Sequence, residues 1–183
     1  MSKLLHSLQG YQVSLDSVQH SELELIRQWR NDPEVARNML SQEPISAEQQ
    51  QAWFKKISRD CTQQHFMIRY KQQPIGVANI RTYYQGENLH QARAVEPGLY
   101  IAEPRYRSNL LAFAPTLLLN DYCFDVLQVE FLAAVVKADN HAALSYNAKL
   151  GYQIEKQADL VEIRLSKADY LQHTQSLKAL LSR

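Results

Sequence analysis

The chain has few of the residues from which covalent, metal and phosphate-loop sites are usually built. Its 183 residues include two cysteines, Cys61 and Cys123, and five glycines. The cysteines lack the spacing of a metal or redox site, and the sequence contains no Walker loop, no G-x-G-x-x-G and no G-x-S-x-G pattern. The six histidines lack the i,i+4 pairing of a helical zinc site. We therefore expect no bound metal.

An excess of charge of either sign is also absent. The 20 basic and 19 acidic residues nearly cancel, which argues against nucleic acid or an anionic membrane as a partner. The longest apolar run, at 109–119, is too short to span a bilayer, and the start of the chain lacks the apolar core of a secretory signal. We therefore expect a reduced, cytoplasmic protein.

The hydrophobic pattern predicts a mixed order of helices and strands. In chain order the expected elements are a strand at 11–18, helices at 21–31 and 45–60, strands at 65–70, 74–84 and 92–103, a helix that follows the turn near 104 and runs to about 125, a strand at 129–138, a helix at 141–150, strands at 152–157 and 160–166, and a terminal helix at 167–183. The length fits one domain, residues 1–183. Short links between the second, third and fourth strands indicate an antiparallel meander.

Three local signals refine this plan. Ser46, with Gln49 three residues later, forms a capping-box pattern. Pro97-Gly98 interrupts the last strand of the meander, so we expect a bulge or a splay of the sheet there. Pro115 lies inside the long predicted helix and should kink it.

Five stretches of the chain together resemble the GNAT superfamily of acetyl-CoA-dependent N-acetyltransferases. They are "WRNDPEVARNM", "PISAEQQQAWF", "LYIAEPRYR", "LLLNDYCF" and "NHAALSYNAKLGYQIE". Within the superfamily they are similar to the branch of ribosomal-protein amino-terminal, spermidine and nucleotide-sugar (flagellin glycan) N-acetyltransferases. The resemblance implies an α/β (α+β) domain with a mixed, mostly antiparallel sheet, a bulged or splayed central strand, and helices on both faces.

The resemblance assigns the cofactor site to the strand and turn around residue 100. Acetyl transfer from a thioester to an amine needs a neutral amine, donors for the carbonyl oxygen, and a proton for the thiolate. In the family, backbone amides of the splayed strand serve the pantetheine arm and the carbonyl. The matching positions here are Leu99, Tyr100 and Ile101.

The turn after this strand normally carries two glycines, and its amides face the pyrophosphate at a helix N-terminus. In this chain the two glycine positions fall on Ser108 and Leu110, on either side of Asn109. Replacing a glycine where φ is positive costs about 1 kcal/mol. Charge-assisted hydrogen bonds from Arg105 and Arg107 are expected to offset part of that loss.

The later family pattern, Asn, two residues, Ala, then Lys-Leu-Gly-Tyr, begins at Asn140. By resemblance Asn140 contacts the pantetheine or pyrophosphate region, whereas as a bare feature it is a helix cap. In many members a tyrosine seven residues later protonates the thiolate. Here that position is Asn147, with Tyr146 beside it. The proton donor is therefore open between water, Tyr146, and Asn147 as a hydrogen-bond donor only.

The sequence says less about the general base and the site of the amine acceptor than about the cofactor site. Glu96 on the splayed strand is the first candidate for taking the proton of the amine, and its alternative is a solvated strand residue. The acceptor is expected against the first two helices and their loop. The expected lining residues are Trp29, Arg30, Asn31, Met39 and Ser41. Arg30 can hold a phosphate or carboxylate, or it can pair with Asp32 or Glu34.

The sequence thus predicts an N-acetyltransferase that moves acetyl from acetyl-CoA to a primary amine. A small amine such as a nucleotide-linked amino sugar is preferred, and a protein amino terminus is the near alternative. The protein is expected to be a monomer or a homodimer. A different class remains open, a catalytically degenerate GNAT fold that binds a ligand or partner, because both turn glycines and the aligned tyrosine are missing.

Overall fold

The computed structural model describes residues 7–183, which hold eight strands and seven α-helices. The strands are β1 (Ser7–Gly10), β2 (Val13–Ser17), β3 (Gln63–Tyr70), β4 (Gln73–Thr82), β5 (Ala94–Ile101), β6 (Phe131–Lys137), β7 (Gln153–Lys156) and β8 (Leu160–Ser166). The helices are α1 (Leu23–Asn31), α2 (Pro33–Ala36), α3 (Ala47–Ile57), α4 (Pro104–Arg107), α5 (Ala114–Asp121), α6 (His141–Leu150) and α7 (Lys167–Leu181). The first six residues, part of the stretch compared with a secretory signal, lie outside this description.

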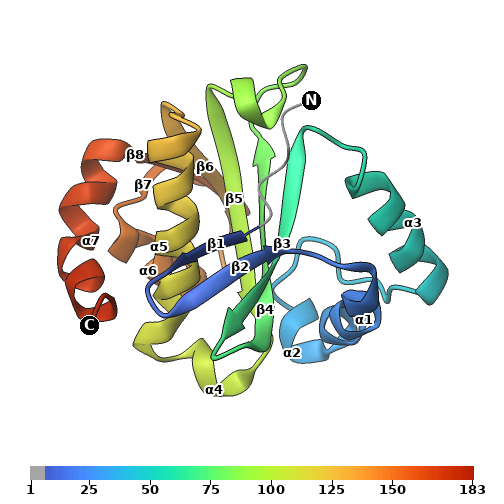
Figure 1. Cartoon of the computed structure of the whole chain (residues 1–183). Coiled ribbons are helices and arrows are strands. Elements are labelled where there is room, and N and C mark those ends of the chain that lie inside the picture. Colours follow the sequence, from blue (N-terminus) through green and yellow to red (C-terminus); the bar gives the residue numbers. More distant parts are fainter. Residues whose placement is uncertain (1–6) are drawn as a thin grey trace.

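The strands form one sheet in the order β1-β2-β3-β4-β5-β6-β8-β7, and β5 with β6 is its parallel pair. Helices α1 to α3 lie on one face and α5 to α7 on the other (Figure 1). The main hydrophobic core fills the space between the sheet and α5 to α7. A smaller core under α1 and α3 includes Leu23, Ile26 and Met67. The mixed, mostly antiparallel sheet with helices on both faces is confirmed.

The amino-terminal half follows the predicted order with two additions. Strand β1 pairs with β2 in a hairpin whose turn residues, Tyr11 and Gln12, have positive φ angles of 51° and 70°. This turn contains no glycine, which is why the hairpin escaped the sequence pattern. Short α2 was also not predicted, and Asp32 caps it by accepting from the Glu34 amide at 2.8 Å. The capping box of Ser46 and Gln49 is confirmed at the start of α3.

The central irregularity of the sheet is a splay between β5 and β6. Strand β4 pairs with β5 from Gly76↔Ile101 to Thr82↔Val95 without a register shift, so this ladder contains no bulge at Pro97-Gly98. Strands β5 and β6 pair only through Ala94↔Phe131 and Val95↔Leu132, after which they separate. The expected splay is confirmed, and it leaves one side of β5 without a strand neighbour from Glu96 onward.

The single helix predicted after residue 104 is wrong, because the segment breaks into several turns. Short α4 is followed by a 3-10 turn at Leu110–Phe113, then by α5, and a π-helical turn at Tyr122–Val126 follows α5. Pro115 lies in the first turn of α5, where no intrahelical N–H is required. The expected kink inside a continuous helix is therefore also wrong.

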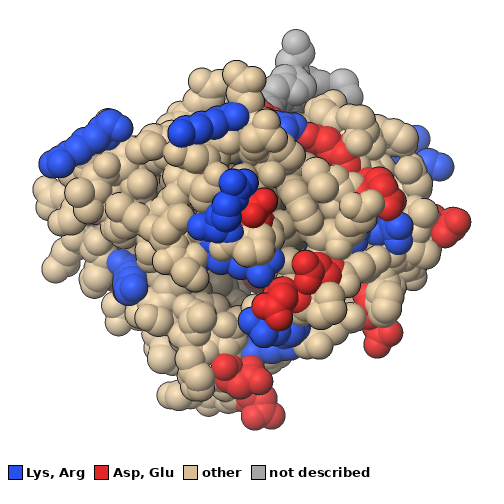
Figure 2. All heavy atoms as spheres, turned by 90° about the horizontal axis from the view of Figure 1, so that it is seen from below, with Lys and Arg blue, Asp and Glu red and all other residues tan. Residues whose placement is uncertain are grey.

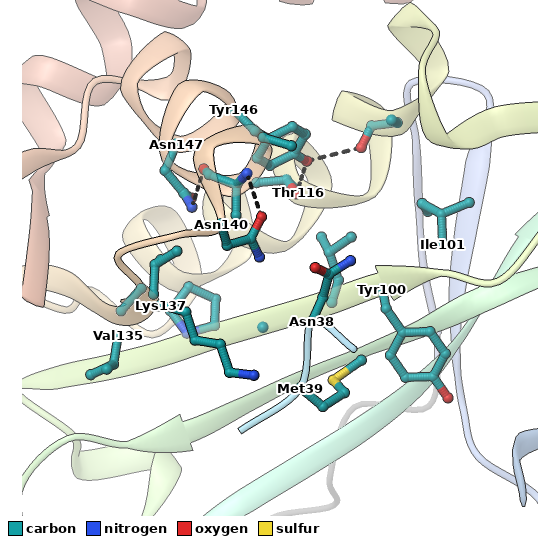
Figure 3. A pocket seen from close by; sticks show the side chains of 18 of the residues that line it. Asn38, Met39, Tyr100, Ile101, Thr116, Val135, Lys137, Asn140, Tyr146 and Asn147 are labelled. Atoms are coloured by element: carbon teal, nitrogen blue, oxygen red, sulfur yellow. Dashed lines mark hydrogen bonds between the residues drawn. The ribbon is translucent and has the colours of Figure 1, made fainter. Parts of the chain in front are cut away.

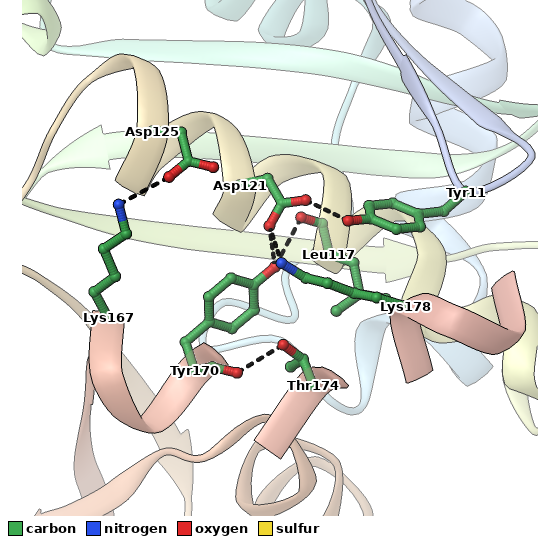
Figure 4. Close-up of polar contacts among 8 residues, drawn as sticks. All are labelled: Tyr11, Leu117, Asp121, Asp125, Lys167, Tyr170, Thr174 and Lys178. Carbon is green, nitrogen blue, oxygen red and sulfur yellow. Dashed lines mark hydrogen bonds and ion pairs between the residues drawn. The ribbon is translucent and has the colours of Figure 1, made fainter. Parts of the chain in front are cut away.

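Helix α5 is held in place by one carboxylate. Asp121 accepts hydrogen bonds from the hydroxyls of Tyr11, in the hairpin turn, and Tyr170, on α7, the latter at 2.6 Å (Figure 4). The Lys178 ammonium on α7 donates to the same carboxylate at 2.6 Å. Through this carboxylate α5 is fixed to the hairpin and to α7, and α5 forms one wall of the cavity described next.

Candidate active site

A cavity of about 400 Å³ lies where β5 and β6 separate, and we call it the interstrand cavity. It is bounded by Pro97–Ile101, Ala134–Lys137, parts of α2, α5 and α6, and the segment after α2. Figure 3 shows Asn140, Tyr146 and Asn147 on one side, and Asn38, Met39 and Lys137 on the other. Because the sheet is open here, the interstrand cavity connects the α5–α6 side with the α1–α2 side.

The α5–α6 wall contains a tyrosine whose hydroxyl is engaged. The Tyr146 hydroxyl donates to the Ala112 carbonyl at 2.9 Å and pairs with the Thr116 hydroxyl at 2.5 Å (Figure 3). Its ring stacks on Phe113 with centroids 4.5 Å apart. Burial raises the pKa of Tyr146, and the Thr116 hydrogen bond opposes this rise. Tyr146 lines the interstrand cavity as a neutral group.

Two further asparagines of the predicted site line the same wall. Asn140 caps α6 by accepting from the Ala143 amide at 3.1 Å, and Asn147 Nδ2 donates to the Ala143 carbonyl at 2.9 Å. Gly151, with φ of 102°, ends α6 as predicted. The predicted strand positions Leu99, Tyr100 and Ile101 also line the interstrand cavity, together with Asn140, Tyr146 and Asn147.

The turn after β5 is built without a need for glycine. No residue between Glu103 and Phe113 has a positive φ, so Ser108 and Leu110 adopt ordinary backbone conformations. The Leu110 side chain is exposed. The Asn109 carboxamide accepts from the Leu111 amide at 2.9 Å and donates to the Arg105 carbonyl at 3.0 Å. Ser108, Asn109 and Leu110 are exposed and are not among the residues of the cavity lining.

The two arginines of this turn lie in different environments. Arg107 lines the interstrand cavity and donates to the carbonyls of Ile101 at 2.8 Å and Ala102 at 2.7 Å. Arg105 points to solvent, where it pairs with Glu103 at 3.3 Å and lies over the Tyr106 ring. Arg107 therefore fixes the end of β5, whereas Arg105 is not among the residues that line the cavity.

On the α1–α2 side, only Met39 of the five predicted acceptor residues lines the interstrand cavity. Asn31 exchanges hydrogen bonds with the backbone of Ile45, and Trp29 packs in the smaller core. Ser41 is exposed. Arg30 lies behind the lining, and its Nη1 is buried without a hydrogen-bond partner in the described structure.

Tyr100 connects Arg30 with the interstrand cavity. Its hydroxyl is likewise buried without a partner among residues 7–183. Burial raises the pKa of Tyr100, and the positive charge of Arg30 opposes the rise. The two unpaired groups are thus close enough to interact electrostatically, at the acceptor side of β5.

The candidate base Glu96 is engaged elsewhere. Its carboxylate accepts from Arg81 Nε at 2.8 Å, and Arg81 is its direct neighbour across the β4–β5 ladder. Glu96 is not among the residues that line the interstrand cavity. Both contacts with Arg81 use Oε2 of Glu96, so the position of Glu96 outside the lining, rather than the ion pair, separates it from an amine in the cavity.

Several lining residues were not anticipated from the sequence. Thr116 and Asn120 come from α5, Asn38 follows α2, and Lys137 ends β6. The Lys137 ammonium donates to the Arg37 carbonyl at 3.3 Å and so joins β6 to the segment after α2. A signal existed for Asn120, because this amide follows three consecutive leucines in a helix that the pattern marks as buried.

The distribution of charged side chains and of possible metal ligands completes the description of the site. In Figure 2, acidic and basic side chains are interspersed on the face seen from below. Within residues 7–183, no group of three His, Cys, Asp or Glu side chains is placed to bind a metal ion. None of the helices in the described part of the chain has the length and apolar character needed to cross a bilayer.

The sequence matches the acetyltransferase (GNAT) domain family over residues 12–153. The chain therefore belongs to the GNAT acetyltransferase family, and it is an N-acetyltransferase with acetyl-CoA as co-substrate. The acetyltransferase PseH of Campylobacter jejuni is 30% identical over 155 residues, which cover 81% of this chain and 88% of that protein.

Solved structures share the fold. The spermidine N-acetyltransferase of Vibrio cholerae in complex with CoA and spermine superposes with a TM-score of 0.73 at 19% identity, covering 87% of this chain and 98% of that one. FdhC, a nucleotide-linked sugar GNAT solved in its apo form, gives 0.76 at 17% identity and covers 98% of this chain and all (100%) of its own.

Proposed function

We propose that this enzyme acetylates the primary amine of a small anionic acceptor, in the first place a nucleotide-linked amino sugar. The observation that carries the proposal is the interstrand cavity, which opens through the splay to both faces of the sheet. Acetyl-CoA enters from the α5–α6 side, and the acceptor enters from the α1–α2 side. The thioester and the amine then meet beside Gly98.

The residues present fit the arm of acetyl-CoA. Backbone groups of Leu99, Tyr100 and Ile101 lack a strand partner on the side of the splay and can bind it. Asn140 and Asn147 offer carboxamides from α6, and Arg107 holds the end of β5 in place. The turn at Ser108–Leu110 then contributes main-chain amides next to a helix start. Bound acetyl-CoA supplies the thioester that the amine attacks.

Proton transfer is assigned first to water. A simple thiol has a pKa of about 8.5, so the departing thiolate is only a weak base. Burial raises the pKa of Tyr146, which makes its hydroxyl a poor proton donor to this thiolate. The Tyr146 hydroxyl also donates to the Ala112 carbonyl already. Glu96 is ion-paired with Arg81, and we propose that it acts on the amine only through water. Tyr146 remains the second candidate for the acid.

We propose a negative charge on the acceptor because of the environment of Arg30. Its buried Nη1 lacks a partner, and the nearby Tyr100 hydroxyl also lacks one. Arg30 is half-buried, and a buried guanidinium N–H without a partner is costly, so a phosphate or carboxylate of the acceptor that extends beyond the cavity lining to this nitrogen would supply the missing hydrogen bond. Lys137 adds a second positive charge at the rim. This arrangement favours a nucleotide-linked sugar over a polyamine.

The test is release of CoA from acetyl-CoA, measured with a thiol reagent, with three acceptors: a nucleotide-linked amino sugar, spermidine and an amino-terminal peptide. We expect turnover with the sugar. In Arg30→Gln the KM for the sugar should rise at least about tenfold while the KM for acetyl-CoA stays unchanged. Turnover with spermidine or peptide alone would contradict the proposed acceptor. A cytoplasmic location, the oligomeric state and a single domain over 1–183 stay predictions.

A further inference from the structure

Asn120 is the one fully buried side chain of the described structure whose carboxamide has no partner at either atom. It is 0% exposed, and both Nδ2 and Oδ1 lack a hydrogen bond. Other buried polar groups nearby are satisfied. Thr116, one turn earlier, pairs with Tyr146, and Thr174 of α7 donates to the Tyr170 carbonyl at 2.6 Å. The orphaned carboxamide therefore has no structural explanation within residues 7–183.

An unpaired buried carboxamide destabilises the free protein. A polar group that loses water without gaining a partner costs free energy, and an apolar side chain of similar volume would not. Leu117, Leu118 and Leu119 precede it in the same apolar helix. A leucine at position 120 would fit this pattern, so the asparagine points to a partner that arrives from outside the chain.

Asn120 is among the residues that line the interstrand cavity, although its carboxamide atoms are covered in the free protein. A partner in the cavity therefore reaches the carboxamide only after a small shift of the neighbouring side chains. Thr116 lines it too, and four residues along a helix correspond to a rise of about 6 Å. Asn120 therefore lies one turn deeper than Thr116, farther from the start of α5 and the turn that precedes it. Ala134, Val136 and Tyr152 also line the interstrand cavity.

The chemistry of the partner follows from the two free atoms. Nδ2 needs an acceptor and Oδ1 needs a donor. On α6, Asn140 has committed its Oδ1 and Asn147 its Nδ2 to the Ala143 backbone, so each retains the other amide atom. The α5–α6 wall of the cavity thus carries several carboxamide atoms, from Asn120, Asn140 and Asn147, that have no intramolecular partner among the described residues. The pantetheine arm of acetyl-CoA, with secondary amides along its length, has the complementary sequence of groups.

We infer that Asn120 is a positioning residue for acetyl-CoA: its carboxamide hydrogen-bonds the amides of the pantetheine arm between α5 and β6 and so fixes the depth of the thioester. This inference rests on the proposed path of acetyl-CoA along the α5–α6 side. It adds a side chain from inside α5 to a site otherwise composed of the splayed strand and the starts of α5 and α6.

The experiment compares Asn120→Leu with the wild type by calorimetric titration against CoA and against adenosine 3′,5′-bisphosphate, which lacks the arm. We expect CoA affinity to fall by about tenfold or more, the change that one lost hydrogen bond of ~1.4 kcal/mol produces. Affinity for the bisphosphate should not change. The free variant should melt at a higher temperature than the free wild type, because the unpaired carboxamide is gone.

Thr174→Val is the matched control, since Thr174 is equally buried, packs near α5 and does not line the interstrand cavity. It should leave both affinities unchanged. Equal CoA affinity in wild type and Asn120→Leu would overturn the inference and indicate that water occupies the carboxamide. An equal loss for both ligands would overturn it too. If Asn120→Leu does not fold, Asn120→Ser is measured in the same way. Failure of the wild type to bind CoA would instead overturn the proposed function.

Discussion

Two arginines that the sequence treats alike have different roles in the structure. Both were expected to compensate for missing glycines by binding phosphate. Arg107 instead donates to the carbonyls of Ile101 and Ala102, at the point where β5 leaves the sheet. Arg105 is largely solvated. Proximity in sequence did not reveal this, because the direction of each side chain depends on the short helix α4.

Arg107→Ala should therefore lower both stability and acetyl-CoA affinity. Removing a charged donor from two carbonyls should lower the free energy of unfolding by about 1–3 kcal/mol, measured by urea titration, and should weaken binding through the displaced end of β5. Arg105→Ala is the control, with a change below about 0.5 kcal/mol, as for exposed ion pairs. A larger binding defect in Arg105→Ala than in Arg107→Ala would restore the original phosphate assignment.

His65 gives the protein a predictable response to acid. Burial lowers its pKa to about 4, with a smaller opposing effect of Asp60, and its ring contacts Trp53. Unfolded histidine has a pKa of about 6.5, so between these values the unfolded chain binds more protons. Stability is therefore fully present above about pH 6.5 and decreases as the pH falls toward 4, by about 1–3 kcal/mol. In His65→Gln this part of the pH dependence should be absent in urea titrations at pH 7.5 and 5. Identical pH profiles of the two proteins would disprove it.

At the scale of elements, strands and capped helices were predictable and the helix around residue 115 was not. Alternation and short links identified β3 to β5, and the capping box located α3. The segment from 104 to 126 has the composition of one long helix. A continuous helix is interrupted at Asn109, because its carboxamide accepts from the Leu111 amide and caps a new 3-10 turn. Whether a side chain or the backbone forms a given hydrogen bond depends on local geometry, and the pattern of apolar residues does not predict the outcome.

The position of α5 depends on Asp121. In Asp121→Asn the Lys178 ammonium loses its counter-ion, both tyrosine hydroxyls lose a charged acceptor, and the one that faces the new amide nitrogen loses its acceptor altogether. We expect a loss of about 2–3 kcal/mol in the free energy of unfolding, measured by urea or thermal melting. Asp125→Asn is the control, because Asp125 pairs with Lys167 at the surface. Asp125→Asn should lower the free energy of unfolding by less than about 1 kcal/mol. Equal losses in both variants would show that Asp121 does not hold α5 in place.

At the scale of the whole molecule, the fold and the family were predictable while much of the site was not. Leu99 to Ile101, Asn140, Tyr146 and Asn147 were assigned from a motif and do line one cavity. Asn120 and Lys137 carry no motif, and they join the cavity only because the sheet opens and brings α5, β6 and the segment after α2 together. Such convergence depends on tertiary packing, which spacing along one chain does not encode.

The separation of β5 and β6 also places two unsatisfied strand edges inside the molecule. From Glu96 and from Ala133 onward these strands have backbone groups that no neighbouring strand pairs, the kind of surface that recruits foreign chains. Helices on one side, and the tether from Lys137 to Arg37 on the other, shield them. Loosening the segment after α2 would unmask these edges while the rest of the sheet remains folded. The enzyme is thus expected to self-associate through this opening on heating before it unfolds globally, and a ligand bound between the two strands should reduce this self-association.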